Sequence, residues 1–320
     1  MAKDILLLTR IDYANTGFRF MRSLQTLGLD CGMVKRYPHI LNYPDQAEQI
    51  ADRRLIVQRS KLYKAIHYIA SQFVSVPLSG KRVVVQHGGS RYRTESDSLN
   101  TFFNPIVDAT VVQTPDLLGL GAKNEHYIVS PVDVGFLAPV FARCDPHVLH
   151  VGHFPSSPEV KGTSTILSVI DRLAKVPGLR PFKYVGIDGS SDECLSWLDH
   201  LERVRRCDIL IETCNETLGG RPFGEWGNAA LEAAALGKIV VTNCHSQAVY
   251  ESVYGPLGLQ VANDEAALLS TLTRLLSLDD GELQGLREET RAWVERNHSL
   301  EATGKRLWSS VYRHLLGDST

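Results

Sequence analysis

Short apolar runs alternate with helical patterns along the whole chain. The runs are rich in Val, Ile and Leu, as strands buried on both faces of a parallel sheet should be. The segments between them place apolar residues at three- and four-residue intervals, which is the spacing of a helix with one buried face. The alternation predicts an α/β architecture in which helices cover both faces of parallel sheets.

The predicted elements fall into two sets. In the N-terminal half, the amphipathic segments 18–27 and 61–73 are predicted to be helices. The strands predicted there are residues 5–9, 31–35, 82–86, 109–113 and 127–130. The strands predicted in the second half are 148–152, 183–186, 208–211, 238–241 and 259–261, and the helices are 163–176, 192–206, 227–236 and 264–278.

The pattern breaks between the two sets near residues 141–146, where Ala-Arg-Cys-Asp-Pro interrupts it. We therefore predict two Rossmann-like domains, residues 1–143 and 144–298. Helical patterns continue over residues 281–297 and 300–316. The closing segment 299–320 is predicted to be a helical extension that could cross back and pack on the first domain.

Composition narrows the class of protein. With 320 residues, 43% of them hydrophobic and 22% charged, the chain can bury a sizeable core. A net charge of −2 gives no general attraction to nucleic acid or anionic lipid. The apolar run at residues 5–8 is too short for a signal peptide, so we expect a cytoplasmic protein. The six cysteines are scattered without zinc-site spacing and are expected to be reduced core residues.

Several common chemistries lack their motif. There is no P-loop, and Gly119-Leu120-Gly121 lacks the third glycine of a dinucleotide site. His87-Gly88-Gly89-Ser90 resembles a lipase oxyanion loop, but no Gly-x-Ser-x-Gly supplies a nucleophile. No Asp-x-Asp is present to hold a metal on a diphosphate. A bound diphosphate would therefore be neutralised by protein cations and backbone N–H groups.

The strand predicted at 148–152 leads through a loop rich in proline and serine into a helix. Lys161 lies where this helix begins, at the carboxyl end of a parallel strand, where open α/β sheets bind ligands. A helix N-terminus favours an anion at that place. A plain alternative stays open, in which Thr163 is an ordinary helix cap and Lys161 a solvated charge.

The strand predicted at 208–211 leads through a glycine-rich loop into a second helix. At its start, the N–H groups of Gly227, Asn228 and Ala229 are unpaired and could hold phosphate or sugar oxygens. Glu232 lies further along this helix, and a buried carboxylate there needs donors such as ribose hydroxyls. Neighbouring backbone N–H groups could satisfy that carboxylate instead.

The two loops, in this order, resemble the nucleotide-sugar site of retaining GT-B glycosyltransferases of family 4 and its relatives. The resemblance rests on residues 231–242, preceded by Trp226-Gly227, and on Lys161-Gly162-Thr163, which looks like the family's phosphate-binding Lys-Gly. Residues 130–133 look like the Pro-x-Asp segment that closes the family's first domain. The likeness also extends to residues 87–88, 110–115 and 311–312.

The resemblance implies a GT-B fold, in which two Rossmann-like domains face a cleft. It also implies that a nucleoside diphosphate sugar binds there as donor, chiefly on the second domain, without a metal or other cofactor. The residues with implied roles are Lys161 for the diphosphate, Glu232 for the ribose, the N–H groups of Gly227, Asn228 and Ala229 for phosphate and sugar, Thr16 and Gly17 for the donor, and His87 beside the transferred sugar.

Two positions depart from the family's pattern. Ser156 stands where the family has an Arg, five residues before the Lys, and remains a donor-binding candidate. Gly224 stands where the family has its first Glu. Glu225, one place later, is therefore the candidate for the sugar hydroxyls. Arg221 could replace the lost guanidinium, because a loop this long can fold back.

Basic residues of the first domain supply two further hypotheses. Arg91 and Arg93, close to His87 in sequence, are candidate acceptor or phosphate contacts, with plain solvation as the alternative. Residues 53–73 combine basic and apolar positions and could form an amphipathic helix that lies on an anionic membrane or binds an anionic acceptor. A domain helix with one solvated face is the alternative to that peripheral membrane contact.

Two functions therefore stay open. The first is an enzyme, a glycosyltransferase that moves a hexosyl or related sugar, with retention, to an unknown glycan, lipid, protein or small-molecule acceptor. The second is a non-catalytic protein that binds nucleotide sugars or glycans on the same scaffold, which the changes at Ser156 and Gly224 favour. A Rossmann oxidoreductase would need the dinucleotide motif that is absent.

Overall fold

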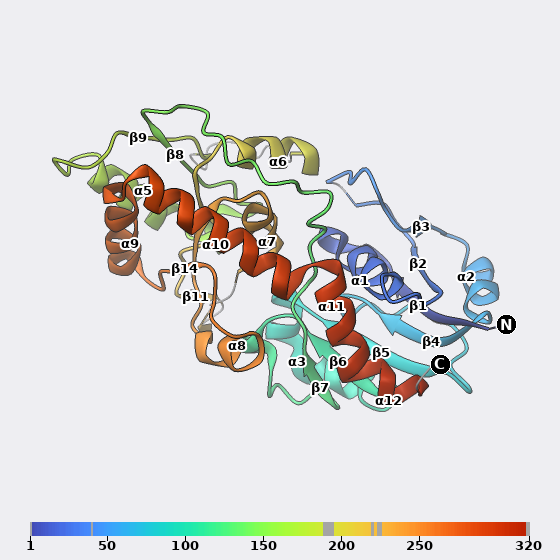
Figure 1. Cartoon of the computed structure of the whole chain (residues 1–320). Coiled ribbons are helices and arrows are strands. Elements are labelled where there is room, and N and C mark those ends of the chain that lie inside the picture. Colours follow the sequence, from blue (N-terminus) through green and yellow to red (C-terminus); the bar gives the residue numbers. More distant parts are fainter. Residues whose placement is uncertain (1, 40, 188–194, 219–220, 223–225, 318–320) are drawn as a thin grey trace. The chain divides into compact units, whose positions relative to one another are not determined.

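The computed structural model (Figure 1) describes residues 2–39, 41–187, 195–218, 221–222 and 226–317. The chain forms two compact units. Unit 1 comprises Met1–Pro131 with His298–Thr320, and unit 2 comprises Val132–Asn297. Each unit is an α/β structure with its own parallel sheet and its own buried core. Within the described ranges, no helix combines the length and apolar content needed to cross a bilayer.

Unit 1 is built on seven described strands that run parallel, in the order β3-β2-β1-β4-β5-β6-β7. Residues 5–8 of β1 are completely buried, because this strand lies inside the sheet between β2 and β4. The strands are β1 (Lys3–Thr9), β2 (Cys31–Lys35), β3 (Glu48–Gln49), β4 (Tyr63–Tyr68), β5 (Arg82–His87), β6 (Ala109–Val112) and β7 (Glu125–Tyr127).

The predicted helix over residues 61–73 is wrong. Strand β4 occupies its centre and pairs with both β1 and β5. Ile66 and Ile69, expected on the apolar face of a helix, are completely buried in unit 1. The helix lies upstream, where Asp52 caps α2 (Arg53–Ser60) by accepting the N–H of Arg54. An amphipathic membrane helix over 53–73 is therefore excluded, because residues 63–68 form a strand within the sheet.

Helix α11 (Leu300–Leu307) packs against α1 (Thr16–Gln25). A Cβ at Gly304 would overlap the Ser23 carbonyl oxygen, so glycine permits this close approach. Further along, Tyr312 Oη lies 2.8 Å from Nδ1 of His67 in β4. Residues 300–316 thus complete the core of unit 1. The other helical segments of this unit are η1 (Tyr13–Asn15), α3 (Gly89–Phe103), η2 (Pro115–Leu117), η3 (Trp308–Tyr312) and α12 (Arg313–Leu316).

Unit 2 has a parallel sheet in the order β14-β13-β10-β8-β9. It confirms the five strands predicted for the second half, each within two residues of its predicted bounds. The strands are β8 (Leu149–Gly152), β9 (Phe182–Tyr184), β10 (Ile209–Ile211), β13 (Ile239–Thr242) and β14 (Gln260–Val261), and a separate antiparallel pair is formed by β11 (Thr217–Leu218) and β12 (Arg221–Pro222).

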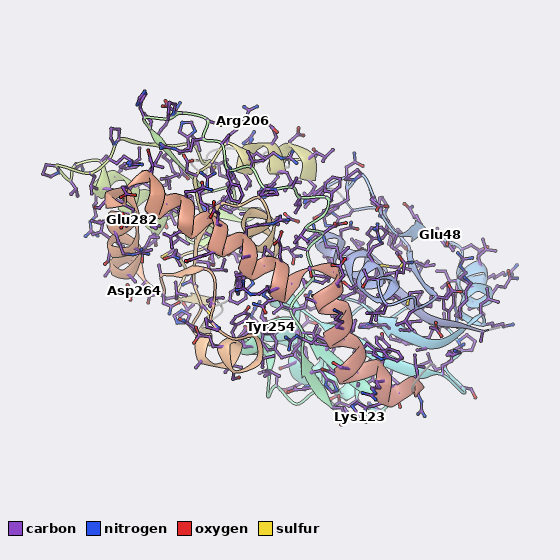
Figure 2. All side chains as sticks on the ribbon, in the orientation of Figure 1. Glu48, Lys123, Arg206, Tyr254, Asp264 and Glu282 are labelled. Carbon is purple, nitrogen blue, oxygen red and sulfur yellow. The ribbon has the colours of Figure 1, made fainter. Side chains whose placement is uncertain are left out.

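The helices of unit 2 begin with local capping signals. Asp264 accepts the N–H of Ala267 at 2.7 Å at the start of α9. Before α10, Asp279 and Glu282 accept each other's N–H at 2.8 and 2.9 Å, a reciprocal capping box. Figure 2 labels Asp264 and Glu282 at these helix starts. The helices are α4 (Pro158–Lys161), α5 (Thr163–Leu173), α6 (Trp197–Arg205), α7 (Asn228–Ala235), α8 (Gln247–Tyr254), α9 (Glu265–Ser277) and α10 (Asp280–His298).

Unit 2 begins at Val132, earlier than the predicted domain boundary at residue 144. Arg291 of α10 donates to the carbonyls of Leu137 at 2.6 Å and Val134 at 2.9 Å. The N–H of Val140 donates to the carbonyl of Leu236 at 2.9 Å. These bonds hold residues 134–140 on unit 2. The segment contains no helix or strand, so the hydrophobic pattern gave no reason to assign it there.

Candidate functional site

Polar groups meet at the carboxyl ends of β8, β10 and β13 in unit 2. Glu212 directly follows β10, is buried and forms an ion pair with Lys161. Its carboxylate also accepts the N–H of Gly227 at 3.2 Å and the hydroxyl of Thr242 at 3.2 Å. We call Lys161, Glu212, Gly227 and Thr242 the Glu212 cluster. Lys161 and the start of α7, predicted to share a site, are therefore joined by a carboxylate that the sequence analysis missed.

The backbone around Lys161 fixes where its side chain begins. Lys161 ends the short helix α4, and Gly162 follows in the left-handed region with φ of 71°. A Cβ at Gly162 would also overlap the Cys214 carbonyl. Both the positive φ and this close contact therefore require glycine. Helix α5 then begins at Thr163. Because the Lys161 side chain is only 17% exposed and ion-paired, the alternative of a solvated charge is wrong.

His153 ties three elements of this region together. Its Nδ1 lies 2.8 Å from the Ile211 carbonyl of β10, and its Nε2 lies 2.9 Å from the hydroxyl of Thr163. The Thr163 hydroxyl thus bonds to a side chain. The alternative, in which Thr163 is an ordinary helix cap, is wrong. Burial lowers the pKa of His153 to about 4, so the ring is neutral at pH 7.

The start of α7 is only partly as predicted. The N–H of Gly227 is not unpaired, because it donates to Glu212. A Cβ at Gly227 would lie 3.0 Å from Oε1 of Glu212 and 3.4 Å from Nζ of Lys161, so a side chain here would press on the ion pair. Asn228 and Ala229 form the first turn of α7 and are partly exposed. Their contacts with a donor stay a prediction.

Glu232 is almost completely buried, with 3% of its surface exposed. The indole N–H of Trp197 in α6 donates to its carboxylate at 3.0 Å, and Phe136 stacks on Trp197 with ring centroids 5.5 Å apart. An indole from another helix therefore supplies the donor that a buried carboxylate needs. Glu232 lies about 7.5 Å along α7 from Gly227 at 1.5 Å per residue. The ribose contact stays a prediction.

His87, at the end of β5 in unit 1, is completely buried. Its Nδ1 lies 2.8 Å from the Ser71 hydroxyl, and its ring stacks on Tyr92 with centroids 4.1 Å apart. Burial lowers the pKa of His87 to about 3, with Arg91 acting in the same direction, so the imidazole is neutral at pH 7. Its Nε2 has no hydrogen-bond partner within the described part of the chain.

In the glycine turn after β1, a carboxylate of the protein already accepts the backbone N–H groups. Asp12 accepts the N–H of Gly17 at 2.7 Å and of Phe18 at 3.0 Å. Burial raises the pKa of Asp12 to about 6, although these two N–H groups act the other way. A Cβ at Gly17 would overlap the Met33 side chain, so glycine serves packing here. Thr16 is buried beside it.

The two candidate arginines of unit 1 differ. Arg93 is mostly buried and forms an ion pair with Asp116, so solvation is wrong for it. Arg91 is half exposed and pairs with Glu95 at 3.0 Å. In unit 2, Ser156 is exposed in the loop before α4. Two further candidates lie outside the described residues, namely Glu225 and the side chain of Arg221.

The described residues contain neither a grouped set of metal ligands nor, among Cys31, Cys207 and Cys214, a thiol with a lowered pKa. Across these ranges, no group of three or more His, Cys, Asp or Glu side chains is placed to hold a metal ion. Cys31, Cys207 and Cys214 are buried free thiols whose pKa values are raised by burial. Raised pKa values leave little thiolate at neutral pH, as expected of structural cysteines.

The paired Rossmann-like units define the fold as GT-B, the fold of its glycosyltransferase neighbours. A glycosyltransferase from Rickettsia africae aligns with a TM-score of 0.63 at 12% identity over 100% of both chains. HepE from Anabaena, solved with UDP and glucose, aligns with a TM-score of 0.61 at 12% identity over 97% of this chain and 99% of its own.

The N-terminal domain of a Candida albicans trehalose-6-phosphate phosphatase aligns equally well. Its TM-score is 0.63 at 9% identity, over 98% of this chain and 97% of that domain. Neither a protein-family model nor a curated protein sequence matches this chain. At such identities the likeness establishes the fold alone.

Proposed function

We propose that this protein transfers a sugar from a nucleoside diphosphate sugar to an acceptor, with retention and without a metal. The observation that carries the proposal is the Glu212 cluster. It brings the Lys161 ammonium to the start of α7, at the carboxyl edge of a parallel sheet in a GT-B fold. Open α/β sheets bind their ligands at this edge. HepE, which shares the fold, was solved with UDP and glucose.

The chemistry asked of the site is mainly electrostatic. When the bond to the sugar breaks, negative charge grows on the departing diphosphate, and a nearby cation stabilises it. An ammonium has three N–H donors. The pairing of Lys161 with Glu212 therefore leaves donors for phosphate oxygens while holding the amine in place. The mostly buried setting of the lysine strengthens that interaction relative to bulk water.

A second function, binding of a nucleotide sugar without turnover, follows from the changes at Ser156 and Gly224, and one further observation bears on both functions. Several groups that the resemblance assigns to the donor already have partners inside the protein. Glu212 accepts the N–H of Gly227, Trp197 donates to Glu232, and Asp12 accepts the N–H of Gly17. A donor would have to share or displace these partners.

Release of nucleoside diphosphate from a panel of nucleotide sugars separates the two functions. The wild type should turn over at least one donor, with activity unchanged by EDTA. Lys161→Ala should lower turnover about 100-fold or more, the usual effect of losing one group that stabilises developing charge. Lys175→Ala, an exposed lysine beyond α5, is the matched control and should leave turnover unchanged.

Three outcomes decide the assignment. Equal turnover by Lys161→Ala and the wild type refutes the role of Lys161. Saturable donor binding with no turnover of any donor supports the binding protein instead. Loss of activity in EDTA contradicts the metal-free mechanism. Proton NMR of the first product tests retention, because the anomeric configuration of the donor should persist.

A further inference from the structure

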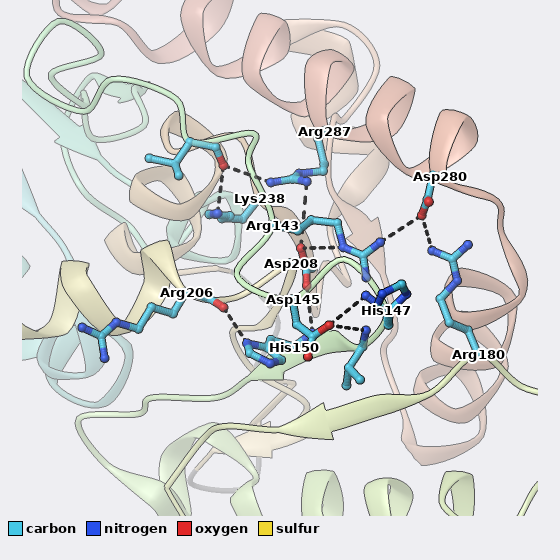
Figure 3. A network of polar contacts seen from close by, with 12 residues as sticks. Arg143, Asp145, His147, His150, Arg180, Arg206, Asp208, Lys238, Asp280 and Arg287 are labelled. Carbon is cyan, nitrogen blue, oxygen red and sulfur yellow. Dashed lines mark hydrogen bonds and ion pairs between the residues drawn. The ribbon is translucent and has the colours of Figure 1, made fainter.

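A second charged cluster lies at the opposite edge of the unit 2 sheet. Leu149 and Ile239 open β8 and β13, and Asp208 directly precedes β10, so this edge holds the amino ends of the strands. The Glu212 cluster lies at their carboxyl ends, about 13 Å away along β10 at 3.3 Å per residue. Figure 3 shows the members of this basic cluster, which are Arg143, Arg180, Lys238, Arg287, Asp208 and Asp280.

The basic cluster borders a cavity of about 320 Å³. Small-molecule sites start near this size, at about 300 Å³. Phe141, Leu149 and Leu283 give the cavity an apolar wall. Arg143 and Arg287 line it together with Asp208 and Asp280. An apolar wall beside guanidinium groups suits a ligand with an apolar part and an anionic part.

Positive charge exceeds negative charge in the basic cluster, where four cations face two carboxylates. Asp280 accepts a bond from Arg143 at 3.0 Å and pairs also with Arg180. Asp208 Oδ1 lies 3.7 Å from Nε of Arg143 and 3.9 Å from Nη1 of Arg287, beyond direct hydrogen bonds. The neighbouring Asp145 accepts backbone N–H groups of residues 147 and 148.

Two nitrogens of Arg143 form no hydrogen bond in the described residues, although Nε lies in an ion pair with Asp208. Arg143 Nε and Nη2 are buried and have no hydrogen-bond partner among the residues that the structure describes. A buried donor left unpaired destabilises a fold, and such groups are rare in native proteins. A guanidinium presents a fork that fits phosphate oxygens, so an anion in the cavity would satisfy both donors once the partly exposed Arg143 side chain turns towards it.

Lys238 and Arg287 are held by backbone carbonyls and add positive potential beside the cavity, whereas Arg180 pairs with Asp280. Lys238 donates to the carbonyls of Val140 at 2.9 Å and Arg205 at 2.8 Å. Arg287 donates to Val140 at 2.9 Å and Gly237 at 3.0 Å. Burial, with Arg287 acting in the same direction, lowers the pKa of Lys238 to about 8. With four cations and two carboxylates in the basic cluster, the local field favours an additional negative charge.

We propose that this cavity binds a small organic phosphate, with the phosphate on Arg143 and the apolar part against Phe141 and Leu283. The site is separate from the Glu212 cluster and does not depend on the proposed sugar transfer. Because Arg287 and Lys238 both hold the Val140 carbonyl, the ligand would lie beside the segment 134–143 that opens unit 2.

Calorimetric titration with phenyl phosphate tests the proposal, in a Lys161→Ala background that removes phosphate binding at the Glu212 cluster. One saturable site is expected, with weaker binding of inorganic phosphate because it lacks an apolar part. Arg143→Gln should weaken phenyl phosphate binding about tenfold or more, the usual effect of losing hydrogen bonds from a charged group. Arg172→Gln, an exposed arginine paired with Glu265, is the control and should bind unchanged.

A second variant predicts the opposite sign. Asp280→Asn removes a carboxylate that is 70% exposed and releases Arg143 Nη1, so phenyl phosphate should bind several-fold tighter. This variant decides the question even if Arg143→Gln does not fold. Weaker or unchanged binding by Asp280→Asn overturns the proposal, and so does the absence of saturable binding. Neither result bears on sugar transfer, which the nucleotide-sugar assay tests separately.

Discussion

Acid should destabilise unit 1 because of three buried histidines. His67, His87 and His298 are completely buried, and burial lowers the pKa of each to about 3. The ordinary histidine pKa is about 6.5, so the unfolded chain binds these protons at a pH where the folded chain does not. The stability that the neutral rings provide is complete above pH 6.5 and is lost as the pH falls from about 6.5 towards 3.

The size of the effect follows from proton linkage. Between pH 7 and pH 5, each of these histidines lowers the free energy of unfolding of unit 1 by about 2 kcal/mol, and the three together lower it by about 6 kcal/mol. Asp12 acts in the opposite direction, because its folded pKa of about 6 lies above the unfolded value. Protonation of Asp12 raises the free energy of unfolding by about 1 kcal/mol over the same pH range. The net loss of about 5 kcal/mol is a large part of the stability of a typical domain, about 5–15 kcal/mol.

Scanning calorimetry at pH 7 and pH 5 measures this loss. For a unit of this size, each kcal/mol of lost stability lowers the thermal midpoint by about 2–4 °C. The midpoint of unit 1 should therefore fall by about 10–20 °C. His67→Asn should reduce that fall by about 4–8 °C, whatever it does to stability at pH 7. His245→Asn, an exposed histidine of unit 2, is the control. If the fall is equally large in His67→Asn, or absent from the wild type, buried neutral histidines do not set the acid stability of unit 1.

Two substitutions test the packing of each unit separately. Glu212→Gln should lower the calorimetric midpoint of unit 2, because the loss of a charged hydrogen-bond acceptor costs about 1.5–3 kcal/mol. An unchanged midpoint would mean that the pair with Lys161 contributes nothing to stability. Gly304→Ala should destabilise unit 1 by about 1–3 kcal/mol through overpacking and lower the midpoint of that unit alone, because the new Cβ overlaps the Ser23 carbonyl. An equal effect on both units would contradict the assignment of α11 to unit 1.

Much of the fold was predictable because parallel strands carry a strong local signal. The run at residues 31–35 matches β2 at both ends. The prediction failed at β4, where every position except Lys64 is buried. A strand buried on both faces loses the period of two, and its apolar positions then also fit a helix. Helix α3 was missed because Gly88-Gly89 and the polar residues after it suggest a loop.

The site was predictable only as far as local pattern reaches. Lys161 and Gly227 were found because each lies where the loop meets the helix in a strand-loop-helix pattern. Glu212 carries the same signal, since it directly follows a buried strand, and could have been found by the same reasoning. The partners of Glu232 and His87 could not, because Trp197 and Ser71 come from other segments and no local pattern specifies them.

The split of unit 1 between two segments sets an order of events during synthesis. Unit 2 is one uninterrupted stretch and can fold as it emerges from the ribosome. The strands of unit 1 emerge earlier, but the helix that packs on α1 and the tyrosine that reaches His67 come only after unit 2. At 5–20 residues per second, the nascent sheet waits roughly 10–30 s with an apolar face uncovered. Chaperones that recognise such faces have that interval in which to act.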